Sequence, residues 1–383
     1  MTEALPSNGS LPRPAWLNPI TPSGRAVLGA LLKAGNLSQA DLPRILDIVQ
    51  PSAARLVGAF KAEGLILASS RQATGRGNPS LSLCLNPDAA FSIGIGLVGD
   101  AIQFAILDIA GNVRAADRVS MPDMARGKVV KVLGTLMRKS VASSGIDAGR
   151  IIGAGVGFSG FFVGSPELFN PPKPLSDWAD VDVAAEVSTA LGLPAVADND
   201  GTTAAIAEAL LGVGRRSGNF ALFHLTNGFG GGLIVDGKPL RGALGNAADF
   251  GGAWWLLDQG YPSLGRLLEL VRARGTAFAT VEDMIRLLKA DTPGVQTWIE
   301  EAERPFALLG SLIGHIMAPE YIVLGGRLPS WLATKLAARL QLPRTPTRNG
   351  RSFPLPEVVA SEVDGDTAAI GAAAMVMQQT FFD

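Results

Sequence analysis

The chain has 383 residues, of which 47% are hydrophobic, and a formal net charge of −1, so it can bury a core and is not a disordered chain. One cysteine, Cys84, and two histidines exclude a disulfide-stapled scaffold and a cysteine-based structural zinc site. The start of the chain has no secretory signal pattern, and no apolar stretch reaches the roughly 18–20 residues of a membrane span. We therefore expect a soluble, cytoplasmic protein with no membrane partner.

The N-terminal part of the chain is mildly basic. Residues 1–88 carry eight Lys and Arg against five Asp and Glu, a net charge of +3, whereas the rest carries 25 against 29. A basic piece on an acidic body is typical of a nucleic-acid-binding module attached to another domain. An ordinary solvated surface could carry the same charge, so the residue pattern within the piece has to distinguish the two.

Residues 1–20 are rich in proline and serine and are predicted to be flexible, and helices follow them. A first helix is predicted to begin at Thr21 and to end at Gly35. A second, short helix follows a capping-box-like start at Ser38. Its predicted inward-facing residues are Leu42, Ile45 and Leu46. Pro43 is an irregularity, because a proline inside a helix removes a hydrogen bond.

The third predicted helix starts near Gln50, with a proline close to its first position. One face is apolar at helical spacing and consists of Ala53, Leu56, Val57 and Phe60. The other face presents Gln50, Ser52 and Arg55, polar side chains that are suited to base edges or phosphates.

Two predicted strands, LILASS and SLSLCLN, flank the turn RQATGRGNP. Three helices followed by a strand, a turn and a strand are the order of a winged helix-turn-helix. Arg71 and Arg76 fall on the wing, where arginine can enter a narrow minor groove. We therefore interpret residues 21–88 as a DNA-binding domain, the alternative being a three-helix protein-interaction module with a hairpin.

The remaining residues form two similar sets of predicted elements. The first set has the strands FSIGIGLV, AIQFAILD and VRAADRVSM, a helix over 128–143 and the strand IIGAGVGF. The second begins near Phe220 with FALFHLTN and GGGLIVD, and continues with a helix around 303–317, the strand YIVLGG and a final helix within 366–379. Two such halves indicate duplicated α/β lobes around a cleft, and clefts of this kind hold small ligands. His224 and His315 lie in apolar contexts and are expected to be structural.

Several segments, in this order along the chain, resemble the ROK family of repressors, open reading frames and sugar kinases. LSQADLPRILDIVQPSAARLVGAFKAEGLI and GRGNPSLSLCLNP resemble the helix-turn-helix, wing and linker of its repressor branch. PAVADNDGTTAAIAEALLG, NGFGGGLIVDGKPLRGALGNAADFGG, YIVLGG and GDTAAIGAAAM resemble its Asn-Asp segment, glycine-rich signature, adenosine-side strand and closing helix. The resemblance implies an α/β, two-lobed, actin/hexokinase-like (ribonuclease H-like) domain over 89–383. Lobe one would span about 89–198 plus the C-terminal helix, and lobe two about 199–365.

The resemblance also implies site residues. In ROK kinases the catalytic base is the Asp of the Asn-Asp pair, which corresponds to Asp200 beside Asn199, although such a pair can also simply cap a helix. Asp249 stands where the family has a sugar-binding glutamate and is expected to keep that role with a shorter side chain. The predicted effector-binding residues are therefore Asn199, Asp200 and Asp249.

Other family positions have changed. The phosphate-binding Asp-x-Gly-Gly-Thr of the kinases corresponds to residues 96–100, where Gly96 replaces the metal-side carboxylate and Asp100 adds a negative charge. The zinc-binding histidine corresponds to Gly252, and the downstream cysteine cluster is absent. We interpret Gly228, Gly230, Gly231 and Gly232 chiefly as hairpin geometry. The sequence therefore predicts no zinc and no binding of ATP with magnesium.

The sequence as a whole predicts a ROK-type transcriptional regulator, a repressor with no catalytic residues in use. It would bind operator DNA through the N-terminal domain and a sugar or sugar derivative in the cleft. Two-fold operators imply a homodimer or homotetramer. The alternatives are an active sugar kinase with Asp200 as its base and an appended DNA-binding head, and a scaffold whose body binds another protein.

Overall fold

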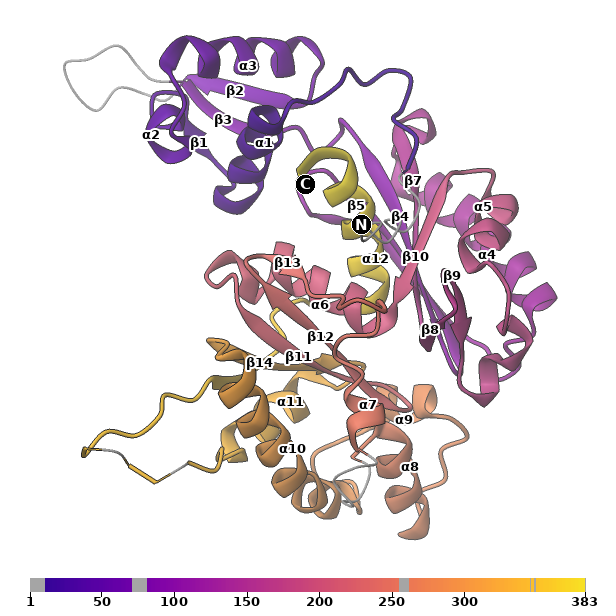
Figure 1. The fold of residues 1–383 in the computed structure, drawn as a ribbon. Coiled ribbons are helices and arrows are strands. Elements are labelled where there is room, and N and C mark those ends of the chain that lie inside the picture. The colour runs from indigo at the N-terminus through magenta and orange to yellow at the C-terminus, as the bar shows by residue number, and fades with distance from the viewer. Residues whose placement is uncertain (1–10, 71–80, 255–261, 345, 348, 383) are drawn as a thin grey trace.

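The computed structural model describes residues 11–70, 81–254, 262–344, 346–347 and 349–382 (Figure 1). Its first part, which we call the N-terminal module, combines three helices with a three-stranded antiparallel sheet of order β1-β3-β2. The elements are α1 (Pro22–Ala34), β1 (Leu37–Ser38), α2 (Leu42–Leu46), α3 (Gln50–Ala62), β2 (Ile66–Ser70) and β3 (Leu81–Leu85).

The helices of the N-terminal module largely follow the predicted pattern. The Thr21 side chain accepts a hydrogen bond from the Gly24 N–H (3.1 Å) and so caps α1. In α3 the four predicted apolar residues are all buried. Helix α2 begins only at Leu42, which places Pro43 in its first turn, where no hydrogen bond is lost. The prediction that Ile45 faces inward is wrong, because α2 has only five residues and leaves Ile45 45% exposed.

Residues 11–20 contain no helix or strand, yet they pack on the protein, contrary to the flexible segment predicted over 1–20. Leu17 is only 3% exposed, and the Arg150 guanidinium lies 4.6 Å from the centroid of the Trp16 ring. The reason is that this stretch contains large apolar side chains among its prolines, of which Leu17 is buried and Leu11, Trp16 and Ile20 are half-buried. Residues 1–10 lie outside the described part of the chain.

Two five-stranded sheets form the body. The first has the order β10-β7-β4-β5-β6 and the second the order β13-β12-β11-β14-β15. In each sheet the first three strands form an antiparallel meander, and the two later strands add in parallel beside the first. The predicted duplication is therefore present as the same strand order in both halves. The first sheet comprises β4 (Phe91–Val98), β5 (Ala101–Asp108), β6 (Val113–Ser120), β7 (Ile151–Phe158) and β10 (Ala195–Asn199). The second comprises β11 (Phe220–Leu225), β12 (Phe229–Val235), β13 (Lys238–Pro239), β14 (Tyr321–Gly326) and β15 (Glu357–Ala360).

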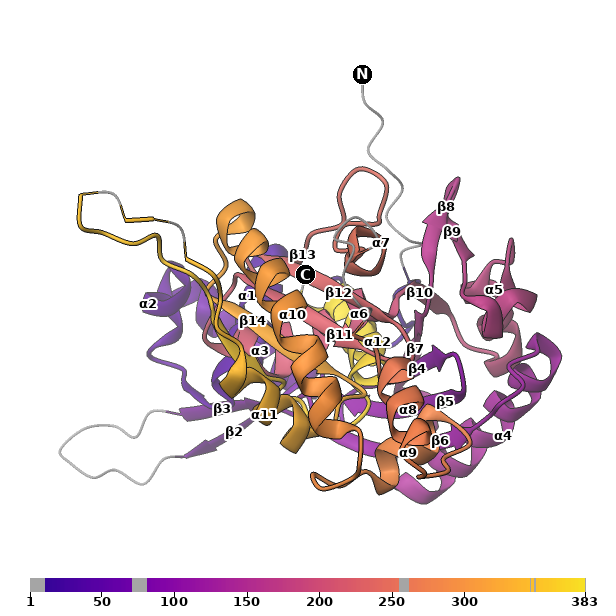
Figure 2. The same cartoon turned by 90° about the horizontal axis from the view of Figure 1, so that it is seen from below.

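Two helices, α6 (Asp200–Leu211) and α12 (Thr367–Met377), pack against each other between the sheets. Helix α12 contacts β4, β5 and β7, and α6 contacts β11 and β12, so the pair connects the two halves (Figure 2). The contact is close, since a Cβ atom at Gly371 would overlap the carbonyl oxygen of Thr203. The sequence of α12, rich in alanine and glycine, suits such an approach.

Further helices cover the outer faces of the sheets (Figures 1 and 2). On the first sheet these are α4 (Arg126–Ser144) and α5 (Val183–Leu191), and beside them lies a small hairpin, β8 (Phe161–Val163) and β9 (Ser165–Asn170). The second sheet packs on α7 (Phe250–Trp254), α8 (Leu264–Ala273), α9 (Val281–Leu287), α10 (Val295–Met317) and α11 (Ser330–Arg339). Helix α10 begins earlier than predicted and contains Pro305. No helix in the described part of the chain is long and apolar enough to cross a membrane.

Candidate functional site

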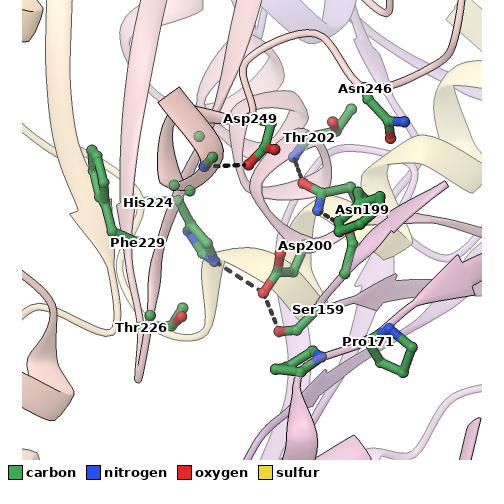
Figure 3. Close-up of a pocket in the computed structure, with 18 of the residues that line it drawn as sticks. Ser159, Pro171, Asn199, Asp200, Thr202, His224, Thr226, Phe229, Asn246 and Asp249 are labelled. Atoms are coloured by element: carbon green, nitrogen blue, oxygen red, sulfur yellow. Dashed lines mark hydrogen bonds and ion pairs between the residues drawn. The ribbon is translucent and has the colours of Figure 1, made fainter. Parts of the chain in front are cut away.

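A cavity of about 590 Å³ lies between the two halves. It is bordered by the β4–β5 turn, the end of β10, the start of α6, the β11–β12 turn and the loop that leads into α7. All three predicted effector-binding residues, Asn199, Asp200 and Asp249, line it, and Figure 3 shows them around one space. The sequence thus placed these three residues in a common site.

The Asn199 side chain caps helix α6. Its Oδ1 accepts hydrogen bonds from the N–H groups of Gly201 (2.9 Å) and Thr202 (3.1 Å), and its Nδ2 donates to the carbonyl oxygen of Gly160 (2.7 Å). These bonds satisfy helix N–H groups that would otherwise have no partner. The capping alternative therefore describes what Asn199 does in this structure, and a contact with an effector stays a prediction.

Asp200 is a buried carboxylate at the floor of the cavity, with an exposed fraction of 7%. Its Oδ1 accepts a hydrogen bond from the N–H of the next residue, Gly201 (3.0 Å), and its Oδ2 accepts a hydrogen bond from Ser159 Oγ. The Nε2 atom of His224, on β11, lies 3.8 Å from Asp200 Oδ2 (Figure 3). Burial lowers the pKa of His224 against the opposing effect of Asp200, so the imidazole is neutral at neutral pH.

Asp249 lies at the mouth of the cavity and caps the short helix α7. Its Oδ1 accepts from the Gly252 N–H (3.0 Å), and any Cβ atom at position 252 would overlap Asp249 Oδ2. The missing side chain at Gly252 is therefore what lets this carboxylate fold back onto the helix. Whether Asp249 also contacts a sugar stays a prediction.

The glycine run has a different function from the hairpin geometry predicted for it. Gly231 and Gly232 lie within strand β12, and a Cβ atom at Gly232 would come within 2.7 Å of the Gly201 carbonyl oxygen. The glycines therefore let the start of α6 pack directly on the strand. This contact positions Asp200 against His224.

In the segment that resembles the kinase phosphate loop, the place of the family's carboxylate side chain is filled by Gln103. Gly96, on β4, faces Gln103 of the neighbouring strand β5, and a Cβ atom at position 96 would overlap Gln103 Oε1. Gln103 itself is only 2% exposed. A carboxylate side chain at position 96 would need Gln103 to move away.

Next to this segment, five charged side chains form what we call the ion cluster: Asp100, Arg118, Glu282, Arg327 and Asp366. Arg327 lies at its centre, 5% exposed, with Nη1 2.6 Å from Asp100 and Nη2 2.7 Å from Glu282. Arg118 pairs with Glu282 (3.0 Å) and with Asp366. The negative charge of Asp100, noted from sequence, is therefore neutralised inside the protein.

The ion cluster joins segments from both halves of the body. Asp100 belongs to the β4–β5 turn of the first sheet, and Arg327 directly follows β14 of the second. Arg327 Nη1 also donates to Asn227 Oδ1 (2.6 Å), in the β11–β12 turn. The cluster thus connects the β11–β12 turn with the turn and the strand that the family resemblance assigns to phosphate and adenosine binding.

The predicted DNA-contacting residues lie on the surface of the N-terminal module where the structure describes them. Gln50 and Arg55 are exposed on α3, and Ser52 is half-buried at its first turn. Arg71 and Arg76 lie outside the described residues.

Sequence reasoning missed three residues of the cavity and its surroundings, namely Ser159, His224 and Arg327. His224 could have been found as a polar residue in an otherwise apolar strand, but the other two carry no local signal. The second histidine, His315, is exposed on α10, where it stacks on Phe353 and its Nδ1 lies 2.8 Å from the Ser311 carbonyl oxygen.

Comparison with known proteins identifies a family domain within the chain. The model of the ROK family matches residues 92–255. These residues are a ROK family domain. The chain is 26% identical to an uncharacterized protein, y4fQ, of Sinorhizobium fredii over 94% of this chain and 91% of that protein. It is 25% identical to a xylose repressor of Caldicellulosiruptor bescii, over 59% of this chain and 56% of the repressor.

Solved ROK structures share the fold. A ROK glucokinase from Streptomyces griseus, in complex with glucose and AMPPNP, superposes with a TM-score of 0.60 at 22% identity, over 76% of this chain and all of the kinase. A ROK transcriptional regulator, a homolog of the E. coli MLC protein, superposes with a TM-score of 0.61 at 18% identity, over 94% and 97%. The predicted α/β fold with actin/hexokinase-like sheets is confirmed. Both repressors and glucokinases of the ROK family are related to this chain.

Within the described residues, no three His, Cys, Asp or Glu side chains are grouped so that they could hold a metal ion. The position of the family's zinc-binding histidine is Gly252, beside the capped helix α7. The described side chains therefore do not fit a zinc ion. At the segments that resemble the kinase phosphate-binding parts, a side chain at position 96 would meet Gln103, and Arg327 is paired with Asp100 and Glu282.

Proposed function

We propose that this ROK protein is a DNA-binding transcriptional regulator, a repressor, that binds a sugar or sugar derivative and does not transfer phosphate. The observation that carries the proposal is the N-terminal module: three helices and a three-stranded sheet, with α3 presenting Gln50 and Arg55 to solvent. We interpret this module as a winged helix-turn-helix with α3 as the recognition helix. The similarity to a xylose repressor and to a ROK regulator supports the proposal.

In this proposal α3 enters the major groove, where Gln50, Ser52 and Arg55 contact base edges or phosphates. Arg71 and Arg76 would contact the minor groove from the wing between β2 and β3. Because operators are commonly two-fold symmetric, we propose that the protein acts as a homodimer or homotetramer in the cytoplasm.

The ROK body would hold the effector in the cavity lined by Asn199, Asp200 and Asp249. A sugar offers several hydroxyl groups, each able to donate and to accept, which suits a wall of carboxylates and amides. An effector can alter DNA binding only if it binds one arrangement of the protein more tightly than another.

The ion cluster favours a regulator over a kinase. Phosphoryl transfer needs backbone amides and cations arranged around the phosphates, with a carboxylate to help hold magnesium. Here Arg327, the cation nearest that region, is committed to Asp100 and Glu282. The retained Asp200 supports the alternative, an active sugar kinase in which Asp200 is the base.

DNA binding is tested by selecting duplexes from a random-sequence pool with the full-length protein and then titrating the selected duplex. We expect Arg55→Ala to weaken binding about tenfold or more, and the affinity of the wild type to fall steeply with salt. Arg138→Ala, an exposed arginine on α4 of the body, is the matched control and should bind like the wild type. Equal affinities for Arg55→Ala and the wild type would contradict the assignment of α3.

The kinase alternative is tested by measuring ADP release from ATP and magnesium with hexoses, pentoses and amino sugars. We expect no sugar-dependent release above background. Sustained turnover that disappears in Asp200→Asn would establish the kinase and refute the non-enzymatic proposal.

A further inference from the structure

His224 is a buried side chain whose ring nitrogens make no hydrogen bond in the described part of the chain, although the Asp200 carboxylate lies 3.8 Å from Nε2. It lies on β11 between two glycines of the neighbouring strands, Gly230 on β12 and Gly325 on β14. It is 2% exposed, and neither ring nitrogen makes a hydrogen bond with any described residue. A buried donor without a partner costs about 1–3 kcal/mol, so such groups are usually satisfied by water or a ligand.

The geometry directs one nitrogen of His224 to the cavity. Nε2 lies 3.8 Å from Asp200 Oδ2, which is too long for a hydrogen bond. Asp200 already accepts from Ser159, whose hydroxyl fixes the carboxylate in place. All three residues line the cavity, as Figure 3 shows. A ligand hydroxyl at this point could accept from one group and donate to the other.

The negative charge of the cavity lining disfavours anionic ligands. Among the described lining residues, the carboxylates of Asp200 and Asp249 are present, and there is no lysine or arginine. Arg327 lies nearby, but its guanidinium is paired with Asp100 and Glu282. A phosphate or carboxylate group on the ligand would meet repulsion here without a compensating cation.

We propose that His224 is a specificity-determining residue for an uncharged polyhydroxylated ligand, one hydroxyl of which is held by His224 Nε2 and Asp200 Oδ2. The inference rests on the proposed function, because it assumes that the cavity binds a sugar-like effector. It adds that anionic sugars are excluded and that His224, not only the Asn-Asp pair, selects the ligand. Neutral imidazole supplies both a donor and an acceptor, and the lowered pKa of His224 is consistent with this role.

The first test is calorimetric titration of the full-length protein with xylose, glucose and mannose, and with glucose 6-phosphate and gluconate. We expect at least one neutral sugar to bind and both anions to bind more weakly. His224→Phe should weaken the binding of that sugar at least tenfold, and His224→Gln, which keeps a donor and an acceptor, should recover part of the loss. His315→Phe is the matched control, because His315 is exposed and stacks on Phe353 outside the cavity.

The second test needs no substitution. The chain has two histidines, so nitrogen NMR of the imidazoles gives two sets of signals, which His315→Phe assigns. Addition of the sugar should shift the His224 signals and leave those of His315 in place.

The outcomes separate this inference from the function on which it rests. A neutral sugar that binds the wild type and His224→Phe equally, or leaves the His224 signals unmoved, would overturn the inference and leave the sugar-binding function standing. Tighter binding of glucose 6-phosphate than of glucose would also overturn it. If none of the five compounds binds, both the inference and the sugar-binding part of the proposed function fail.

Discussion

Arg327 illustrates how a single buried charge can organise a site. Removing a guanidinium from water costs several kcal/mol, and this cost is recovered only when its partners are close and well oriented. Arg327 meets that condition through Asp100, Glu282 and Asn227, which come from three separate segments. It therefore connects the β4–β5 and β11–β12 turns, both of which border the cavity.

Replacing Arg327 should be strongly destabilising. Arg327→Met would leave Asp100 and Glu282 buried beside an apolar side chain, and we expect a loss of about 3–5 kcal/mol in the free energy of unfolding. Arg339→Met is the control: Arg339 pairs with Glu303 on the surface, where solvent screens the pair and the loss should be much smaller. Denaturant unfolding of both variants measures the difference, and similar losses would contradict the view that the ion cluster is a buried unit.

His224 should make stability depend on pH in one direction. Burial lowers its pKa in the folded protein, Asp200 opposes the shift, and Arg327 adds to it. On acidification the unfolded chain therefore binds the proton first, near the ordinary histidine pKa of about 6.5. The contribution of His224 to the free energy of unfolding is complete above that pH and is lost as the pH falls below it. The slope for one proton is at most about 1.4 kcal/mol per pH unit.

The measurement compares the free energy of unfolding at pH 7.5 and pH 5.5 for the wild type and His224→Gln. We expect the wild type to lose more stability on acidification than the variant. His315→Gln should behave like the wild type, because that side chain is exposed. If His224→Gln loses as much free energy of unfolding on acidification as the wild type, protonation of His224 does not destabilise the folded protein and the prediction is wrong.

At the scale of elements, the α6–α12 pair depends on small residues. Gly371→Ala would normally favour a helix by about 1 kcal/mol, but here the new methyl group would overlap the Thr203 carbonyl. We expect a net destabilisation of about 1–3 kcal/mol, because the helices must move apart. In Gly29→Ala, on α1, the methyl group meets nothing within 4 Å, so thermal unfolding should show an increase in stability instead. A stabilised Gly371→Ala would contradict the close contact.

Most of the element pattern could be predicted from the sequence, because periodic burial is a local property. Strands β4, β5 and β11 and the apolar face of α3 follow directly from their residues. Ile45 was wrongly predicted to face inward, because the sequence of α2 does not determine how long the helix is or how much surface it covers.

The site could be predicted only in part. Asp200 and Asn199 follow from a motif, but the ion cluster joins residues 100, 118, 282, 327 and 366, and no local pattern reveals such pairings. The capping bonds of Asn199 and the unpartnered nitrogens of His224 likewise depend on atoms brought together by folding.

At the scale of the whole molecule, the N-terminal module and the body share one apolar core. The cluster that contains Val27 and Leu28 of α1 also contains Met377 of α12 and Phe381 of the π-helical turn that follows it. Arg25 of α1 donates to the carbonyl oxygen of Gln379 in the same turn (3.1 Å). In Figure 1 the yellow end of the chain lies beside the N-terminal module. The N-terminal module therefore packs directly on the body and is not joined to it by a linker alone.

Because the N-terminal module packs on the body, helices α6 and α12 connect the cavity to that module. Helix α6 begins at Asp200 in the cavity, runs against α12, and α12 ends beneath α1. A displacement of α6 that moved α12 would reach the N-terminal module through packed side chains, because both belong to one apolar core. In the proposed regulator, this packed path would connect occupancy of the cavity to the position of α3.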